Sequence, residues 1–457
     1  MQSRFQNWLS PAGLGAVLLG LAVLLLSAAP GHAVTVERVV SPGGVEAWLV
    51  RDHSVPITAI EFSFRGGAAS DPAGKTGLAS MTTSLLDEGA GELDSQAFQG
   101  RLEDLSVRMS FNAGLETVRG SFKTLNRNRD EAVTLLRLAL NEPRFDPEAI
   151  ERMRRQITAG LKRKSTDPNV LASRVWRRAV FGEHPYARPV DGTLGSIKDI
   201  SVQDLRGFVA KRFARDRLIV GVVGDITPDV LGPMLDDIFG GLPATTSASG
   251  PSDVATGAGG ETFVVQMDIP QSVVVFGHEG VRRKSPDYYP AYVMNYILGG
   301  GGFSSRLYHE VREKRGLAYS VYSYLNPMKH GALITGGVAT RNDQVAQSLA
   351  VIREEWGRMR EAGPSADELT HAKTFLNGSF PLRLSSTGSI ARMLVAMQYN
   401  DLGLDYMDRR QDFINAVTLA DVQRVARRML DPDQLTVVVV GSPESVKPTA
   451  KAPDIES

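Results

Sequence analysis

The chain has 457 residues, of which 42% are hydrophobic, enough for two domains that each bury a core. Its 51 Lys and Arg residues balance 51 Asp and Glu residues, so the chain lacks the basic excess that nucleic-acid ligands require. The sequence has no cysteine, which excludes disulfides, thiolate metal ligands and a lipid anchor on cysteine.

The N-terminal segment, residues 1–33, has the composition of a secretory signal peptide. Arg4 precedes an apolar run from Leu14 to Ala29, and small residues follow it up to Ala33. This pattern predicts cleavage after Ala33 and export to a bacterial periplasm. The run is shorter than the roughly 20 residues that a membrane-spanning helix needs. We therefore expect no membrane contact after cleavage; an uncleaved anchor is the alternative.

Two blocks of the remaining chain, residues 34–242 and 261–448, both place strand-like segments before helical ones. The first begins with "VTVERVV", "GVEAWLVRD" and "ITAIEFSFRGG", and the second begins with "ETFVVQMD" and "SVVVFGHEG". Residues 243–260 are rich in Ser, Thr, Ala and Gly, which indicates a flexible linker, and residues 449–457 form a tail. This order predicts an α+β fold of two domains, each a mostly antiparallel sheet with helices packed on one face.

The two blocks also share an internal repeat. Residues 200–226 align with residues 417–443 at a constant offset of 217 and without a gap, so that Gly224 meets Gly441. Each copy predicts a helix that begins at a Ser or Thr cap, followed by a Val-rich strand that ends in Gly. Duplication of one domain explains this pattern better than chance does, so we expect two homologous domains.

Four longer phrases resemble those of a known enzyme family. In chain order they are "WLVRDHSVPITAIEFSFRGGAASDPAGKTGLA", "FDPEAIERMRRQI", "HPYARPVDGTLGSIKDISVQDLRGF" and "SRLYHEVREKRGLAYSVYS". Together they resemble the pitrilysin or insulinase family of zinc metallopeptidases, in the two-domain bacterial form that is similar to the subunits of mitochondrial processing peptidase. The resemblance covers nearly all of the chain after residue 33, and it implies the α+β fold of these peptidases.

In that family a His-x-x-Glu-His motif follows the "GLA" phrase; the two His residues bind zinc and the Glu activates the bound water. This chain carries Ser80, Thr83 and Ser84 at those positions. At the position of the further Glu ligand it offers Ala159 or Gly160. Neutral hydroxyls are poor zinc ligands and cannot act as the base, so the resemblance implies a chain without its own metal and zinc in a partner subunit. A zinc site built from histidines distant in sequence is the alternative.

A second pair of family positions is kept in "FSSRLYHEVREKRGLAYSVYSY". In the resembling family, an Arg and a Tyr seven residues apart hold the substrate backbone near the zinc, and the matching residues here are Arg312 and Tyr319. A guanidinium can donate to a peptide carbonyl, and a phenol can donate to a developing oxyanion. The alternative is structural: Arg312 would lie on a charged helix face with Glu313 and Lys314, and Tyr319 would pack on a strand.

Four consecutive glycines precede this pair, in "LGGGGFSSRL": Gly299, Gly300, Gly301 and Gly302. Such a run lets a peptide backbone approach closely, and it resembles the substrate loop of the non-catalytic processing-peptidase subunit. The alternative is a plain helix terminus. The run lacks the Gly-Lys-Ser/Thr ending of a phosphate-binding loop. His184, in "HPYARP", also matches the family, and we interpret it as a turn and packing residue.

Two functions fit these features. In the first, the chain is the metal-free, non-catalytic subunit of a periplasmic heterodimeric peptidase. Inactive alone, it lends Arg312 and Tyr319 to a homologous zinc-bearing subunit that cleaves peptides. In the second, it is a structural or peptide-binding relative, like the non-proteolytic core subunits that this family contributes to a respiratory complex. Retention of the Arg and Tyr beside the loss of the metal ligands favours the first.

Overall fold

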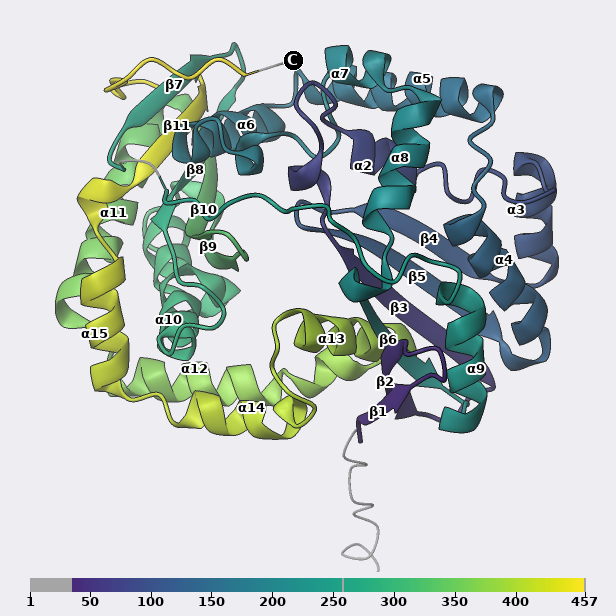
Figure 1. Ribbon diagram of the computed structural model, residues 1–457. Helices are drawn as coiled ribbons and strands as arrows, with labels where there is room; N and C mark the ends of the chain where they lie inside the picture. Colours follow the sequence, from purple (N-terminus) through teal and green to yellow (C-terminus); the bar gives the residue numbers. More distant parts are fainter. Residues whose placement is uncertain (1–34, 257–258, 456–457) are drawn as a thin grey trace, which may run out of the picture. The chain divides into compact units, whose positions relative to one another are not determined.

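The structure is a computed structural model that describes residues 35–256 and 259–455. The predicted signal peptide lies outside the described residues. Within them, none of the helices combines the length and the apolar character needed to cross a membrane. The chain folds into two β-sheets with helices around them (Figure 1).

The strands fall into one group before the linker and one after it. The first group is β1 (Glu37–Val40), β2 (Glu46–Arg51), β3 (Ile57–Arg65), β4 (Arg108–Ala113), β5 (Thr117–Leu125) and β6 (Leu218–Gly224). The second group is β7 (Thr262–Gln266), β8 (Gln271–Glu279), β9 (Ala318–Pro327), β10 (Ala332–Arg341) and β11 (Thr436–Gly441).

The helices are divided in the same way. Those before the linker are α2 (Leu78–Thr83), α3 (Ser95–Asp104), α4 (Arg129–Asn141), α5 (Pro147–Lys164), α6 (Pro168–Phe181), α7 (Leu194–Asp199), α8 (Val202–Arg212) and α9 (Pro228–Phe239). Those after it are α10 (Tyr288–Asn295), α11 (Val345–Ala362), α12 (Ala366–Gly378), α13 (Thr387–Tyr399), α14 (Tyr406–Asn415) and α15 (Leu419–Met429).

The two sheets have the same strand arrangement, with one extra edge strand in the first. The first sheet has the order β1-β2-β6-β3-β5-β4, and the second has the order β7-β11-β8-β10-β9. In each sheet one parallel pair, β2 with β6 or β7 with β11, adjoins a run of antiparallel pairs. The last strand of each segment, β6 or β11, therefore inserts between strands formed much earlier in the chain.

The two halves repeat one another in detail. Helices α8 and α15 lie 217 residues apart, and each begins with a capping box formed by a Ser or Thr and an Asp. In each sheet a phenylalanine covers a glycine on the paired strand: Phe62 lies opposite Gly120, and Phe276 lies opposite Gly336. A Cβ at these glycines would lie 2.0 and 2.3 Å from the ring, so only glycine fits. These features confirm the predicted pair of homologous α+β domains.

One face of each sheet packs against the helices of its own half. Hydrophobic side chains alternate along β3 and point toward those helices, as the period of a strand requires. The ring of Phe62 lies 5.4 Å from that of Phe239 on α9. In the second half, the ring of Phe276 lies 5.7 Å from that of Trp356 on α11. Each half therefore has a hydrophobic core of its own.

The opposite face of each sheet is covered by one helix from the other half. Helix α6 lies on β8 and β11, whereas α13 lies on β6 and β3 (Figure 1). Trp176 of α6 is buried and donates from Nε1 to the carbonyl of Thr436 at 3.0 Å. Arg392 of α13 pairs with Glu61 of β3 at 3.1 Å. Helices of the same half thus cover one face of each sheet, as predicted, and a helix exchanged from the other half covers the opposite face. Local sequence patterns do not reveal this exchange.

The segment between the halves follows the surface of both. Residues 243–256 contain no helix or strand. Arg217 donates to the carbonyl of Ala248 at 2.7 Å, and the backbone N–H of Val254 donates to the carbonyl of His330 at 2.8 Å. The segment therefore has contacts on both sides, and its mobility stays a prediction.

Candidate functional site

Helix α2 carries the residues that align with the zinc motif. The hydroxyls of Thr83 and Ser84 both donate to the carbonyl of Ser80, each at 2.9 Å. The buried carboxylate of Asp71 accepts two backbone N–H bonds at the start of this helix, at 2.9 and 3.1 Å. Burial raises the pKa of Asp71 to about 7, although these N–H bonds oppose the rise. The hydroxyls of Thr83 and Ser84 are therefore engaged by the backbone of their own helix.

Helix α5, which packs against α2, supplies the downstream positions. Ala159 and Gly160 have no ligand atom in their side chains, and a Cβ at Gly160 would meet only the guanidinium of Arg163, at 4.0 Å. Within the described ranges, no group of three or more His, Cys, Asp or Glu residues is arranged to hold a metal ion. Zinc prefers imidazole, thiolate and carboxylate ligands, so the side chains at the aligned positions do not fit this metal.

The structure brings Arg312 and Tyr319 together. Arg312 lies on a π-helical turn, Tyr308–Glu313, and Tyr319 is the second residue of β9. The guanidinium lies over two phenol rings, 4.8 Å from the centre of the Tyr308 ring and 4.5 Å from the centre of the Tyr319 ring. It also donates a hydrogen bond to the Tyr308 hydroxyl. Cation–π contacts with two rings, together with this hydrogen bond, restrict the orientation of the charge.

The surroundings of this pair are exposed and aromatic. Tyr319 is 82% exposed, and in the described chain its hydroxyl has no hydrogen-bond partner. Phe303 is 74% exposed, and its ring meets that of Tyr308 edge-on at 4.9 Å. We call Phe303, Tyr308, Arg312 and Tyr319 the Arg312 cluster. Its free phenol and its remaining guanidinium donors are available to a ligand.

Glu310 holds the turn that carries Arg312. Its buried carboxylate accepts from Lys314 at 2.7 Å and from Arg315 at 2.6 Å. Burial alone would raise the pKa of Glu310, but Lys314 and Arg315 outweigh this effect and lower the pKa to about 2. The carboxylate therefore stays ionised, and it ties the turn to the residues that lead into β9.

The glycine run lies against β9. Helix α10 continues into a second π-helical turn, Tyr296–Gly300. A Cβ at Gly299 would lie 2.4 Å from the Ser323 hydroxyl and 2.7 Å from its backbone nitrogen. Asn295 strengthens this contact, because its side chain accepts from the Ser323 hydroxyl at 2.8 Å. Gly302 has a φ of 56° and open space around it. Gly299 thus permits close packing, whereas Gly302 permits a turn; a role as substrate loop stays a prediction.

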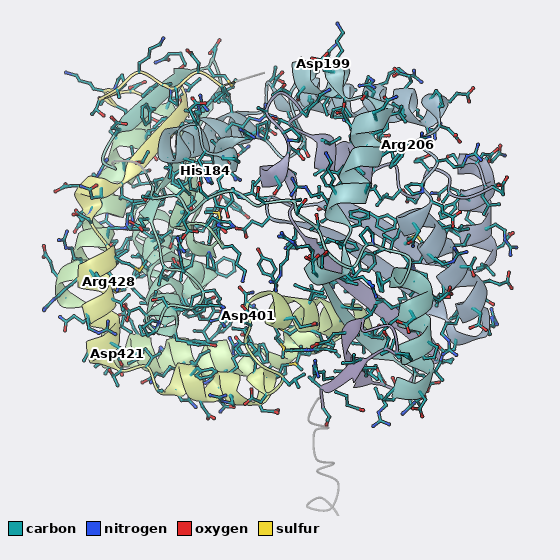
Figure 2. The ribbon with its side chains drawn as sticks, in the orientation of Figure 1. His184, Asp199, Arg206, Asp401, Asp421 and Arg428 are labelled. Atoms are coloured by element: carbon teal, nitrogen blue, oxygen red, sulfur yellow. The ribbon has the colours of Figure 1, made fainter. Side chains whose placement is uncertain are left out.

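Two members of the Arg312 cluster were not predicted. Tyr308 precedes Arg312 by four residues, a spacing that places side chains side by side on a helix and could have identified it. Phe303 has no such signal, because its contact depends on the fold of the glycine run. His184, labelled in Figure 2, accepts from the backbone N–H of Tyr186 at 3.2 Å, and its ring meets that of Tyr186 at 4.8 Å. These contacts agree with a turn and packing role.

Comparison with known proteins points to relatives in a peptidase family, some described as inactive and others as zinc proteases. Residues 199–376 match a family model described as "Peptidase M16 inactive domain". The "Non-peptidase homolog YmxG" of Helicobacter pylori is 28% identical over 432 residues, which are 94% of this chain and 98% of that protein. The "Uncharacterized zinc protease YmxG" of Bacillus subtilis is 23% identical over 407 residues, 88% of this chain and 98% of that protein.

Solved structures give the same result. The "peptidase M16 inactive domain" from Pseudomonas fluorescens has a TM-score of 0.84 and 27% identity, and the match covers 90% of this chain and 99% of that one. A protease from Helicobacter pylori has a TM-score of 0.81 at 18% identity, covering 89% and 100%. A chain of Complex III2 from Candida albicans has a TM-score of 0.72 at 16% identity, covering 89% and 96%. The last two show the fold alone. The matches confirm the predicted resemblance, and the family model, the non-peptidase homolog of Helicobacter pylori and the Pseudomonas fluorescens structure support a non-catalytic member of the family.

Proposed function

Because the chain is similar over most of its length to inactive, non-peptidase members of the M16 family, we propose that it is the non-catalytic subunit of a heterodimeric zinc peptidase. Its partner is a homologous subunit that carries the zinc, and the pair cleaves peptides. The signal-like N-terminal segment supports a periplasmic location for the complex.

The observation that carries this proposal is the contrast between the two family sites. At the zinc motif, Thr83 and Ser84 turn their hydroxyls onto their own helix. At the Arg312 cluster, a guanidinium contacts two aromatic rings, one of which is the exposed phenol of Tyr319. A chain that needed neither site would have no reason to hold a charged side chain in so defined an orientation at its surface.

The chemistry available to the cluster is binding and charge stabilisation. In the proposed complex, Arg312 donates to a carbonyl of the bound peptide, and its permanent charge keeps it a donor at any physiological pH. The Tyr319 hydroxyl donates to the oxygen of the attacked carbonyl as negative charge develops there. Zinc in the partner subunit would activate water and polarise the carbonyl. Binding and hydrolysis are therefore divided between the subunits.

Exposed aromatic side chains around Arg312 support contact with another molecule. Phe303 and Tyr319 are large side chains with most of their surface in water, which is unfavourable unless a partner or ligand covers them. Aromatic residues and arginine are also the types enriched at the centres of protein interfaces.

The test is turnover of a quenched peptide by this chain mixed with its zinc-bearing partner. Tyr319→Phe should lower turnover on the order of 100-fold to 1,000-fold, the usual cost of removing one oxyanion donor. Arg312→Ala should lower turnover and also raise KM, because a charged donor to the peptide is lost. Size-exclusion chromatography should show that both variants still assemble with the partner.

A matched control separates this role from a structural one. Arg206→Ala removes an exposed arginine from α8 and should leave turnover unchanged. If Tyr319→Phe and Arg312→Ala support full activity, the cluster is structural, and the non-proteolytic relative becomes the better function.

A further inference from the structure

A cavity of about 500 Å³ lies between the two halves. Its walls come from β3 and β5 of the first sheet, from α13, and from the segment around Arg283 and Met328 in the second half. Neither Arg312 nor Tyr319 lines it. The cavity is therefore a second place where this chain could hold a ligand, and it does not depend on a partner subunit.

The walls of this cavity carry more positive than negative charge. Four arginines line it, Arg119, Arg177, Arg283 and Arg392, against two carboxylates. One carboxylate, Glu61, forms an ion pair with Arg392 at 3.1 Å.

The other carboxylate, Glu116, is also fully engaged. It accepts from the hydroxyls of Tyr186 and Tyr399, and from the backbone N–H of Lys329 at 2.8 Å. Nearby Asp401, labelled in Figure 2 beyond the end of α13, pairs with Lys284 at 2.7 Å. Among the described residues, no acidic group forms an ion pair with Arg119, Arg177 or Arg283, and four arginines against two carboxylates leave the lining with a net positive charge.

Those three arginines have only neutral hydrogen-bond partners in the described part of the chain. Arg119 donates to the Thr117 hydroxyl at 3.3 Å, and Arg177 donates to the carbonyl of Tyr186 at 2.6 and 3.0 Å. Arg283 donates to two tyrosine hydroxyls at 3.2 and 3.3 Å, with the ring of Tyr288 4.0 Å away. A guanidinium has five N–H donors, so each keeps donors that none of these contacts uses. Arg177 and Arg283 are partly buried, and a buried charge without an ion-pair partner is costly, whereas Arg119 is exposed at the same cavity.

We propose that this cavity is a binding site for the carboxylate groups of an acidic peptide. Arginine suits this ligand, because its planar donors match the two oxygens of a carboxylate. The charges converge from both halves of the chain, so a bound peptide would also hold the halves together.

A second cavity, of about 230 Å³, supports a peptide over a small anion. It runs between α6 and β9, and its lining includes Tyr322 and Tyr324. Arg177, Asn326 and Met328 line both cavities. A ligand with carboxylates in the larger cavity can therefore extend along an aromatic surface, as a peptide with apolar side chains would.

The experiment measures fluorescence anisotropy of labelled peptides with the purified chain alone. The probe is a C-terminally amidated peptide with several Glu residues; the same peptide with Gln at those positions tests side-chain carboxylates, and the Gln peptide with a free C-terminus tests the terminal carboxylate. The Glu peptide should bind more tightly than the Gln peptide, and added salt should weaken its binding. Equal binding of the Glu and amidated Gln peptides would overturn the proposal, and tight binding of only the free-terminus Gln peptide would reassign the site to a chain end.

Three variants locate the site. Arg119→Gln should weaken binding of the Glu peptide about 10-fold, the loss expected for a charge-assisted hydrogen bond. Glu61→Gln should strengthen it, because a competing carboxylate is removed, and an unfolded protein could not give this result. Arg206→Gln, on α8 away from the lining (Figure 2), is the matched control and should change nothing. If Arg206→Gln weakens binding as much as Arg119→Gln, or if Glu61→Gln does not strengthen it, the proposal fails. Because the chain is tested alone, these results do not depend on the heterodimer.

Discussion

Glu310 ties the Arg312 turn to its neighbours through charge, so the stability of the chain should depend on its ionisation. Its pKa is about 2 in the folded chain, below its ordinary value of 4.5. A depressed folded-state pKa stabilises the fold fully above about pH 4.5, and this contribution is lost as the pH falls toward about 2. Lys314 is 52% exposed, so water screens the pair, and we expect a contribution of about 1 kcal/mol.

Urea unfolding of the wild type and of Glu310→Gln at several pH values measures this contribution. The variant should be less stable by about 1 kcal/mol near pH 6, and the difference should shrink to less than half near pH 3. Glu313→Gln, which removes a half-exposed carboxylate from the same turn, is the control and should have little effect. A difference that stays constant over this pH range would show that packing of the side chain, and not its charge, holds the turn.

The residues of the Arg312 cluster differ in how far sequence could predict them. Arg312 and Tyr319 keep a spacing of seven that matches the family, and the structure brings them together. At the zinc positions, sequence predicted the loss of ligands, but not that the hydroxyls of Thr83 and Ser84 would bond to Ser80. The arginines of the cavity lie far apart along the chain, so their convergence follows only from the packing of the two halves.

At the scale of elements, the glycine run, Gly299 to Gly302, owes its composition either to close packing or to mobility, and a substitution at Gly299 distinguishes the two. Gly299→Ala would place a Cβ 2.7 Å from the backbone nitrogen of Ser323, an atom that cannot move without disturbing β9. We expect a loss of about 2 kcal/mol in the free energy of unfolding, as in other overpacked sites. Chemical denaturation of the purified variant measures it.

Gly207→Ala is the matched control, because Gly207 lies within α8 and has open space around it. Alanine favours helix there, so this variant should be neutral or more stable by up to about 1 kcal/mol. If Gly299→Ala is as stable as the wild type, the run is loosely placed, as a substrate loop would be. Sequence left both explanations open, since four glycines fit a loop as well as a helix end; the position of β9 shows which glycine is closely packed.

At the scale of the whole molecule, the two halves depend on each other through the exchange of α6 and α13. Sequence predicted two homologous α+β halves: the order of strand-like and helical segments indicated the class, and the repeat at an offset of 217 residues indicated the homology. It could not predict the exchange, because the periodicity of a helix identifies its apolar face but not the sheet that this face meets. Removal of α6 would expose hydrophobic side chains of the second sheet, among them Phe263, Val438 and Val440, to water.

Cleavage of the chain between the halves should therefore not separate them. A protease site inserted within residues 243–256 would yield two fragments, and these should elute together in size-exclusion chromatography under native conditions.

Trp176→Ala removes the buried indole that α6 inserts against the second sheet, along with its bond to Thr436, at a cost of about 3–5 kcal/mol. The cleaved variant should then separate into its fragments. Trp356→Ala removes an equally buried indole, but its partner His278 lies in the same half, so it should lower stability while the fragments stay together. Two outcomes would contradict the claim that the exchanged helices hold the halves together. The unmutated fragments would elute separately as folded species, or both Trp variants would separate the fragments equally.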